Sequence, residues 1–508
     1  MIATALLLLA IGAPGSEPAT ACHAALEQAY DGSTGAALVR LAQLNREQPD
    51  LLCAYTELLV RAFDLEQQPE SPARDREQLR RAESLIALAE ERLSGSAQDP
   101  RARFVRGAAY GLESRLHLLR WQKRAAAQTA ARMREDLLQV AESDPLWSEA
   151  QFGLGLYDYY ADVLPRMLKL LRFLTGLPGG DRVRGLEAIE LARERAQLHR
   201  TEARVQLFDI YAFYEGRDDD ALVEMLELRR LYPGAPRWAL KLCEHQRERL
   251  GLQRESAQTA REILHSSEGG HPNYAPVVGA MARVQLGEAL LLDLQPAEAS
   301  RALEPALRLP LPPDWMARAR LALGRSLDLR GERQRAEPLL RAAAETGDKE
   351  VRARAQRALR EPLSSTGRAA LSQLAEGRRL RGEGRELEAA SAYARALALD
   401  PGSQESALRV AEAQIQAGRL LEAREHIEGL LDEDDPEPAW VRPWAQLFSA
   451  RLDDLAGRRE PALQQYNQVF KHPLGSQALR ELAAEGLRHP FRAPSPGASR
   501  PPRADHPR

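Results

Sequence analysis

Apolar residues recur along most of the chain with the spacing of one face of an α-helix. A clear example is the series Leu79, Ala82, Leu85, Ile86 and Ala89, because residues three and four apart share a helix face. These regions are rich in Ala, Leu, Arg and Glu and poor in β-branched residues, a composition that favours helices. Short breaks with Gly, Pro or Asp separate them. The pattern therefore predicts an all-α chain of helices of about 12–16 residues joined by tight connections.

An internal repeat organises the predicted helices of the C-terminal half. In the clearest copy, residues 370–403, the small, aromatic and helix-ending positions are Gly377, Ala389, Tyr393, Ala396 and Pro401. The pattern returns about 34 residues later with Ala411, Ala423, Ile427 and Leu430. Looser copies place small residues at Gly287, Ala299, Gly324, Ala336 and Ala462. The period predicts an α-solenoid of antiparallel helix pairs, in which small residues allow close helix packing.

The repeat pattern resembles the tetratricopeptide repeat (TPR) family. This resemblance implies that the first helices of successive repeats line a concave groove that binds peptides or protein surfaces. Positions just after the Gly or Ala of the first helix would face the groove, and these are Glu288, Arg325, Arg378, Glu412 and Arg451. Their mixed charge predicts a polar protein partner. Relatives that grip a carboxylate use a groove Lys, which is replaced here by Val284, Leu321, Leu374 and Leu408, so a carboxylate clamp is not expected.

The segment 146–214 departs from the repeat pattern. It resembles a diverged segment of bacterial exported TPR proteins, and distantly the inclusion-body-clearance TPR family, through Gly180-Asp181-Arg182 followed by Gly185-Leu186. Asp181 is predicted to cap a helix, and Gly185 to permit a close helix approach.

Aromatic residues gather in the same segment, at Phe152, Tyr157, Tyr159, Tyr160 and Phe173. They predict either a helix that packs its apolar stripe inward or a pocket for a ligand or partner. The basic amphipathic stretch 166–172 also allows membrane-surface contact.

The N-terminus has the features of a secretory signal. An apolar run over residues 5–11 is followed by Ala19-Thr20-Ala21, which fits a cleavage site, so residues 1–21 are predicted to be removed. Export, as to a periplasm, is the expectation, with a cytoplasmic location as the alternative. No later segment has the roughly 18–20 apolar residues of a membrane span. Three states of Cys22 stay open: lipid modification, a free thiol, or a bridge to Cys53, which would add roughly 3–4 kcal/mol of stability.

Charge and motif content narrow the functional classes. The 70 basic and 73 acidic residues leave a net charge of only -3, which argues against a nucleic-acid partner. The three cysteines form no CxxC pair and the ten histidines no HExxH motif, so no metal, cofactor or catalytic site is predicted.

Composition divides the chain into a signal at 1–21, a diverged helical-repeat region at 22–264, a TPR-like array at 277–485 and a Pro- and Arg-rich disordered tail at 486–508. We predict a non-catalytic scaffold or adaptor that binds other proteins in a bacterial cell envelope. The alternatives are a ligand-binding or enzymatic module within 146–214 and a membrane-peripheral assembly factor.

Overall fold

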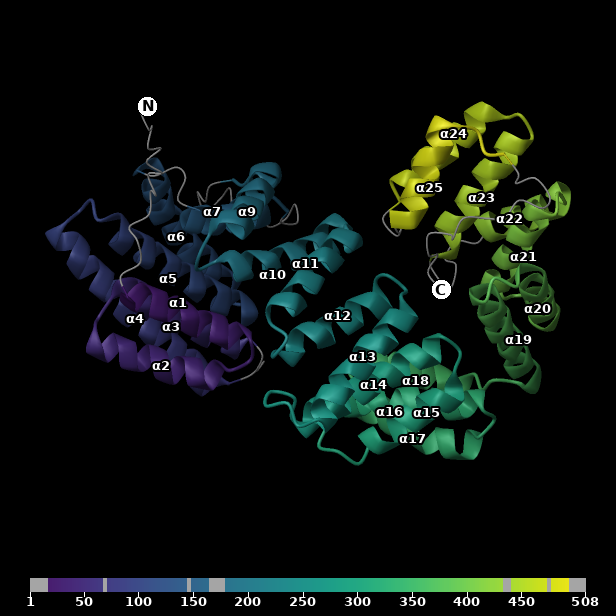
Figure 1. The fold of residues 1–508 in the computed structure, drawn as a ribbon, viewed down its shortest axis with the longest axis horizontal. Helices are drawn as coiled ribbons and strands as arrows, with labels where there is room; N and C mark the ends of the chain where they lie inside the picture. The colour runs from purple at the N-terminus through teal and green to yellow at the C-terminus, as the bar shows by residue number, and fades with distance from the viewer. Residues whose placement is uncertain are drawn as a thin grey trace, which may run out of the picture. The chain divides into compact units, whose positions relative to one another are not determined.

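The computed structural model describes residues 17–66, 71–143, 148–163, 179–432, 440–472 and 477–492. Every regular element in these ranges is a helix. The helices pack chiefly against their neighbours along the chain, as Figure 1 shows for the labelled elements. The chain is therefore an all-α helical repeat, which confirms the fold class predicted from the periodicity.

Parts of the predicted organisation lie outside the described residues. These parts are most of the signal segment 1–21, the basic stretch 166–172 with Phe173, and the tail from residue 493. The first helix begins at Glu17, so the predicted cleavage position after Ala21 falls within it. Among the helices that the structure describes, none combines the length and apolar character needed to cross a bilayer.

The described helices form two compact units. The N-terminal unit comprises residues up to Ile210 together with Glu224–Ala235. Its helices are α1 Glu17–Tyr30, α2 Thr34–Glu47, α3 Leu51–Leu65, α4 Pro72–Gly95, α5 Pro100–Leu119, α6 Lys123–Ser143, α7 Ser148–Val163, α9 Arg182–Arg195 and α10 Arg200–Ile210. Helix α11, Asp218–Leu231, crosses the division between the units.

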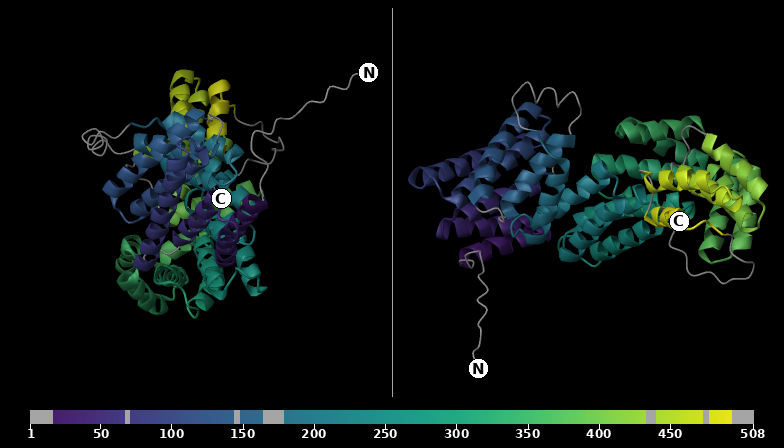
Figure 2. Two further views of the ribbon diagram at one scale, coloured as in Figure 1. Left: turned by 90° about the vertical axis from the view of Figure 1, so that its left-hand side faces the viewer. Right: turned by 90° about the horizontal axis from the view of Figure 1, so that it is seen from above.

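The C-terminal unit comprises Tyr211–Val223 and the chain from Pro236 onward. It begins with a π-helical turn, η1 Tyr211–Glu215. Its further helices are α12 Pro236–Glu248, α13 Gln253–Glu268, α14 Pro276–Leu292, α15 Pro296–Ala306, α16 Pro313–Leu329, α17 Arg333–Thr346, α18 Lys349–Arg360, α19 Ser365–Gly382, α20 Glu386–Leu399, α21 Gln404–Gln416, α22 Leu420–Asp432, α23 Val441–Leu455, α24 Arg459–Phe470 and α25 Gln477–Arg488. Within this unit the helices stack side by side (Figure 2).

Polar side chains fix where several helices begin. Asp50 and Asp99 accept hydrogen bonds from backbone N–H groups in the first turns of α3 and α5. Ser403 does the same for α21. Each cap satisfies donors that have no partner inside the helix, which is why the helices start at these residues.

Glycine on the first helix of a pair faces a large side chain on the second. A Cβ atom added at Gly287 would collide with Leu303, one at Gly324 with Leu340, and one at Gly377 with Tyr393. These pairs have the same sequence spacing, so the same contact recurs from repeat to repeat. The small residues Ala299, Ala336, Ala396, Ala423 and Ala462 of the second helices are fully buried. Pro401 is exposed just beyond the end of α20.

Replacing Ala389 with leucine is expected to lower the free energy of unfolding of the C-terminal unit by roughly 1–3 kcal/mol. Ala389 is 1% exposed and belongs to a small core with Leu374 and Tyr393, so added methyl groups would force the helices apart. Urea denaturation provides the measurement. Leu387→Ala on the same helix is the matched control, because Leu387 is 87% exposed and its truncation should change stability little. An unchanged midpoint for Ala389→Leu would contradict the predicted packing.

Candidate functional site

The five predicted groove residues all lie on first helices of the C-terminal unit. Glu288 is on α14, Arg325 on α16, Arg378 on α19, Glu412 on α21 and Arg451 on α23. They are thus distributed along the array rather than gathered at one point. Arg325 is half-buried. The structure gives several of them partners on neighbouring first helices.

Ion pairs join first helices of successive repeats. The Glu288 carboxylate accepts hydrogen bonds from Arg318 Nε and Nη2 on α16, at 3.1 and 2.7 Å. Arg378 Nε and Nη2 donate to Glu405 on α21, at 2.9 and 2.6 Å. Although burial raises the pKa of Glu405, the adjacent Arg378 guanidinium holds it below its ordinary value. These two-point pairs fix the guanidinium groups in orientation along the first-helix face.

A second contact between α19 and α21 involves Glu412. Arg381 donates to its two carboxylate oxygens at 2.6 and 3.1 Å, and Arg409 donates to one of them at 3.3 Å. The Arg409 guanidinium is buried and lies over the Trp440 ring, 5.3 Å from its centroid. Burial and the neighbouring Arg381 charge lower the pKa of Arg409. One buried carboxylate therefore serves two arginines.

Arg451 has an aromatic environment. Its guanidinium lies 4.6 Å from the ring centroid of Phe491 and 5.8 Å from that of Phe448. Both distances are in the range of a cation–π contact. Glu288, Arg378 and Glu412 take part in ion pairs between first helices, so their substitution would also affect the packing of the array.

The aromatic residues of the diverged segment mostly pack inward. On α7, Phe152 and Tyr159 are buried. Tyr157 lies beneath Arg134, 5.4 Å from ring centroid to guanidinium, and Tyr160 donates to Gln206 at 3.2 Å. The described aromatics thus follow the packing interpretation of the two that the sequence allows.

Three buried polar side chains of the N-terminal unit are linked in a series of hydrogen bonds. The Tyr55 hydroxyl is 2.6 Å from Nε2 of His199, and the other ring nitrogen of His199 is 2.9 Å from Glu149. Phe152 stacks on the His199 ring with centroids 4.8 Å apart. Glu149 also accepts the backbone N–H groups of Gln197, Leu198 and His199, at 2.5, 2.9 and 3.1 Å. Glu149 therefore orients the histidine and caps the start of α10.

A second buried cluster is centred on Glu202 of α10. Its carboxylate accepts from Arg115 Nη1 at 2.5 Å and from the Tyr30 hydroxyl at 3.1 Å. Arg115 also donates to Glu66 at 2.7 Å, so one guanidinium joins two carboxylates. Burial opposes the charge on Arg115, but Glu202 and Glu66 hold its pKa above the ordinary value. No sequence motif marks these residues, because their partners lie far away along the chain.

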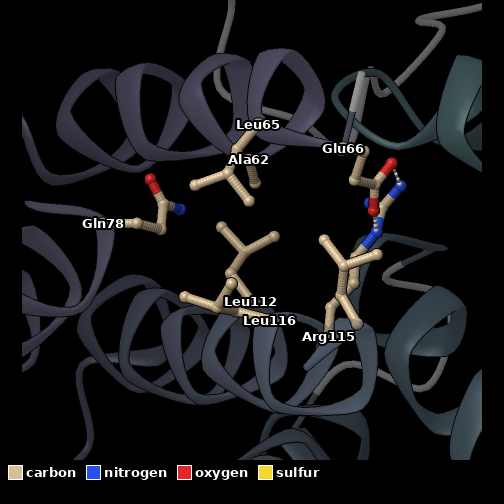
Figure 3. A pocket seen from close by; sticks show the side chains of 8 residues that line it. Ala62, Leu65, Glu66, Gln78, Leu112, Arg115 and Leu116 are labelled. Carbon is tan, nitrogen blue, oxygen red and sulfur yellow. Dashed lines mark hydrogen bonds and ion pairs between the residues drawn. The ribbon is translucent and has the colours of Figure 1, made fainter. Parts of the chain in front are cut away.

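A shallow pocket adjoins this cluster. It is small and has apolar walls from α3 and α5. Figure 3 shows Leu65, Leu112 and Leu116 directed toward its middle, with Gln78 on one side and the Glu66–Arg115 pair on the other. The polar groups at its rim are already bonded, since Gln78 donates to the Leu58 carbonyl at 3.2 Å. The pocket therefore offers apolar contact more than new hydrogen bonds.

Residues at and just after the Gly-Asp-Arg turn hold the start of α9 against α7. Asp181 accepts the Arg184 N–H at 3.0 Å and caps α9, and the Arg184 side chain donates to Asp158 on α7 at 2.8 Å. Gly185 lies so close to α7 that an added Cβ would be 2.5 Å from the Tyr159 backbone nitrogen and 2.8 Å from the Gly155 oxygen. In this structure the residues of the Gly-Asp-Arg turn and Gly185 thus allow α9 to pack closely against α7.

Replacing Gly185 with alanine is expected to lower the free energy of unfolding of the N-terminal unit by about 1–3 kcal/mol. The colliding atoms are backbone atoms of α7, which cannot rotate away as a side chain could. Thermal denaturation and hydrogen exchange of the α7 and α9 amides provide the measurement. Gly95→Ala is the control, because nothing lies within 4 Å of a Cβ added there. Equal effects of the two substitutions would contradict the close approach.

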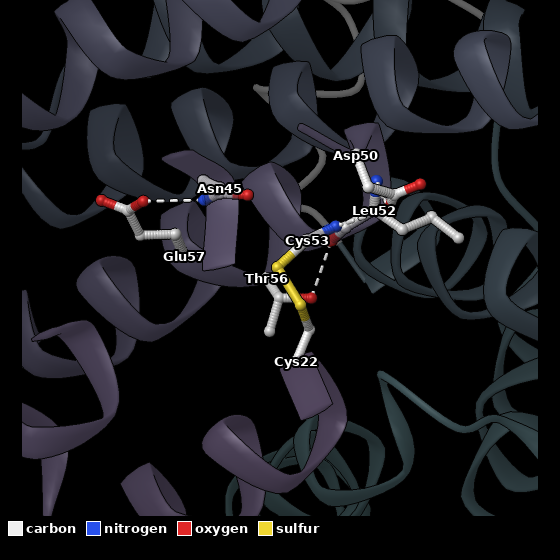
Figure 4. Close-up of a disulfide and its surroundings, with 7 residues drawn as sticks. All are labelled: Cys22, Asn45, Asp50, Leu52, Cys53, Thr56 and Glu57. Atoms are coloured by element: carbon white, nitrogen blue, oxygen red, sulfur yellow. Dashed lines mark hydrogen bonds between the residues drawn. A yellow bond between two sulfur atoms is a disulfide. The ribbon is translucent and has the colours of Figure 1, made fainter. Parts of the chain in front are cut away.

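A disulfide joins α1 to the start of α3. Cys22 and Cys53 are bonded and both are 2% exposed. Figure 4 shows the bridge beside Thr56, whose hydroxyl donates to the Leu52 carbonyl at 2.7 Å. Of the three states left open for Cys22, the structure has the bridge. Cys243 in the C-terminal unit is a free, buried thiol whose pKa burial raises to about 11.

Comparisons with known proteins concern mainly the repeat array. The family model of the tetratricopeptide repeat matches residues 380–442, which contain α20, α21 and α22. No curated protein matches the sequence.

Among solved structures, a monomeric IFIT1 mutant with Gppp-AAAA is 12% identical, with 93% of this chain and 86% of that chain covered and a TM-score of 0.26. The human IFIT1 dimer with PPP-AAAA is 13% identical, with coverages of 94% and 86% and a TM-score of 0.25. The TPR domain of P58(IPK) is 15% identical, with coverages of 74% and 98% and a TM-score of 0.22. Likenesses at such TM-scores carry no inference about this chain. The family match identifies residues 380–442, within a stack of helix pairs, as a tetratricopeptide-repeat segment.

Proposed function

We propose that this chain is a non-catalytic scaffold that binds other proteins, exported to a bacterial cell envelope. The observation that carries the proposal is the tetratricopeptide segment at 380–442, because repeats of this family generally mediate protein–protein interaction. The ion pairs between first helices support it. They hold guanidinium groups such as Arg318 and Arg378 partly exposed, with side-chain exposures of 21% and 20%, in fixed orientations. A preorganised polar face loses little entropy on binding.

The disulfide supports export. A buried bridge between Cys22 and Cys53 persists in oxidising compartments, whereas cytosolic thiols are normally kept reduced. The same bridge uses the Cys22 sulfur atom that lipid modification would need. The proposed mature chain is therefore periplasmic or otherwise exported and carries no lipid at Cys22.

The test is affinity capture from an extract of the native cell, with the mature chain and two variants as bait. Arg325→Glu with Arg451→Glu reverses the charge of two predicted groove residues, one on α16 and one on α23. Arg301→Glu with Arg341→Glu is the matched control, since these side chains on the second helices α15 and α17 are 75% and 66% exposed. Circular dichroism confirms that each bait is folded.

A protein captured by the wild type and the control variant, but lost by the Arg325 and Arg451 variant, supports binding at the first-helix face. Equal retention by all three baits would place the binding elsewhere and contradict the predicted groove. Absence of any specific partner would contradict the scaffold itself.

A further inference from the structure

The turn between α5 and α6 presents a tryptophan to solvent. Trp121 is 81% exposed, and Leu118, one helical turn earlier, is 60% exposed. Both residues lie at the tip of the helical hairpin in the N-terminal unit. The two side chains form an exposed apolar pair at this end of the hairpin.

The backbone at Trp121 is strained. Its φ of +59° lies in the left-handed region, which is unfavourable for a bulky residue. The Trp121 N–H bonds to the Leu118 carbonyl at 3.0 Å, and the Gln122 N–H to that of His117 at 2.8 Å, which closes the helix end. Six described helices of the C-terminal unit close with the same two bonds, five of them around Gly270, Gly331, Gly384, Gly418 and Gly457 and one around Leu294. Glycine would fit the Trp121 turn with less strain, so the indole is present at a cost in stability.

Two cations directly follow the tryptophan and Gln122 in the sequence. Lys123 and Arg124 are exposed, and the Lys123 ammonium lies 5.7 Å from the centroid of the Trp121 ring. Within the described ranges neither forms an ion pair. Arg120 differs, because it donates to both oxygens of Asp75 at 2.6 and 2.8 Å. The tip therefore offers two positive charges that pair with no carboxylate in the described part of the chain.

We propose that this tip, defined as Leu118, Trp121, Lys123 and Arg124, docks reversibly on an anionic phospholipid surface. Tryptophan favours the headgroup depth of a bilayer, and lysine and arginine meet the lipid phosphates. Lysine is depleted in protein–protein interfaces, which argues against a protein partner at this tip. Small-molecule sites are concave, whereas this tip is a projecting turn between two helices, which argues against a small ligand. One indole and two cations give weak, reversible binding and not a permanent anchor.

Vesicle co-sedimentation of the full chain tests the proposal. Phosphatidylcholine vesicles with and without phosphatidylglycerol serve as the surface. Trp121→Gly should reduce partitioning to anionic vesicles about tenfold, since it removes the side chain that enters the interface. Lys123→Gln with Arg124→Gln should reduce it about 25-fold, at about fivefold for each cation, and only on anionic vesicles. Arg301→Gln with Lys349→Gln, two exposed cations of the C-terminal unit, should leave partitioning unchanged.

Thermal denaturation separates binding from folding. Trp121→Gly should raise the midpoint by about 2–4 °C because glycine relieves the left-handed strain, so its loss of binding cannot come from unfolding. A lower midpoint would show that the indole supports the fold and would overturn the proposal. Equal binding of wild type to neutral and anionic vesicles, or of Trp121→Gly and wild type to anionic ones, would also overturn it. So would a soluble acidic protein that binds through Trp121 while vesicles do not.

Discussion

Replacing Glu202 with alanine is expected to lower the free energy of unfolding of the N-terminal unit by about 3–5 kcal/mol. Glu202 is 1% exposed, and its carboxylate is the acceptor for both Arg115 and Tyr30. Its removal leaves the partly buried Arg115 side chain, which is 26% exposed, with Glu66 as its remaining carboxylate partner among the described residues. A partly buried charge that loses a partner recovers only part of its hydration, which is why the cost is large.

Urea denaturation measures this loss of stability, and hydrogen exchange of the α10 amides assigns it to the N-terminal unit. Glu194→Ala is the matched control in the same unit. Its side chain is 60% exposed and pairs with Arg193 at 3.3 Å, so its removal should cost less than about 1 kcal/mol. Similar losses for the two variants would show that the ion pair of Glu202 with Arg115 contributes little to the free energy of unfolding.

The same cluster gives the N-terminal unit a defined response to acid. Burial alone would raise the pKa of both Glu202 and Glu149. The Arg115 guanidinium nevertheless holds the pKa of Glu202 below its ordinary value. His199 and backbone N–H groups do the same for the pKa of Glu149. The unfolded chain therefore binds protons at a higher pH than the folded chain. The stabilisation is complete above the ordinary carboxyl pKa of about 4.3 and is lost as pH falls through the folded values.

Glu202→Gln should reduce this dependence, because the amide does not titrate in that range. Urea midpoints measured between neutral pH and about pH 3 should fall less steeply for Glu202→Gln than for wild type. The variant should be less stable at neutral pH, and the difference between the two proteins should narrow on acidification. Parallel curves would contradict the assignment of the acid response to Glu202.

The sequence predicts the repeat half of the fold because its signals are local. Helical periodicity reflects the geometry of one helix, and the spacing between Gly377 and Tyr393 reflects contact within one helix pair. The cap at Asp181 involves the next few residues only. Such features are encoded within about 34 residues, the length of one repeat, and can therefore be predicted from the sequence alone.

The polar clusters could not be predicted in the same way. Tyr55 and His199 are separated by 144 positions, and His199 and Glu149 by 50, so their contact depends on how several helices stack. The groove charges show the same limit. The sequence places Arg378 on a first helix, but only the stacking of α19 on α21 decides that it pairs with Glu405. A side chain that the sequence predicts to face a partner therefore forms an ion pair within the array instead.

Removing the Cys22–Cys53 bridge is expected to lower the free energy of unfolding of the N-terminal unit by roughly 3–4 kcal/mol. The two cysteines are 31 positions apart, so the bridge restricts a sizeable loop of the unfolded chain. It also ties α1 to α3, and α1 supplies Tyr30 to the Glu202 cluster. Loss of the bridge should therefore increase exchange of the α1 amides before those of α5 or α6.

Denaturation of wild type with and without reductant, compared with Cys22→Ala/Cys53→Ala, isolates the effect of the bridge. Reductant should destabilise wild type and leave the double variant unchanged. Because Cys243 is a free thiol in the C-terminal unit, the transition of that unit should not respond to reductant in either protein. A wild type insensitive to reductant, with an intact mass that includes a lipid at Cys22, would contradict both the bridge and the proposed state of the exported chain. An oxidised mass without lipid, lost stability on reduction and an unresponsive double variant together support a chain that matures where disulfides form.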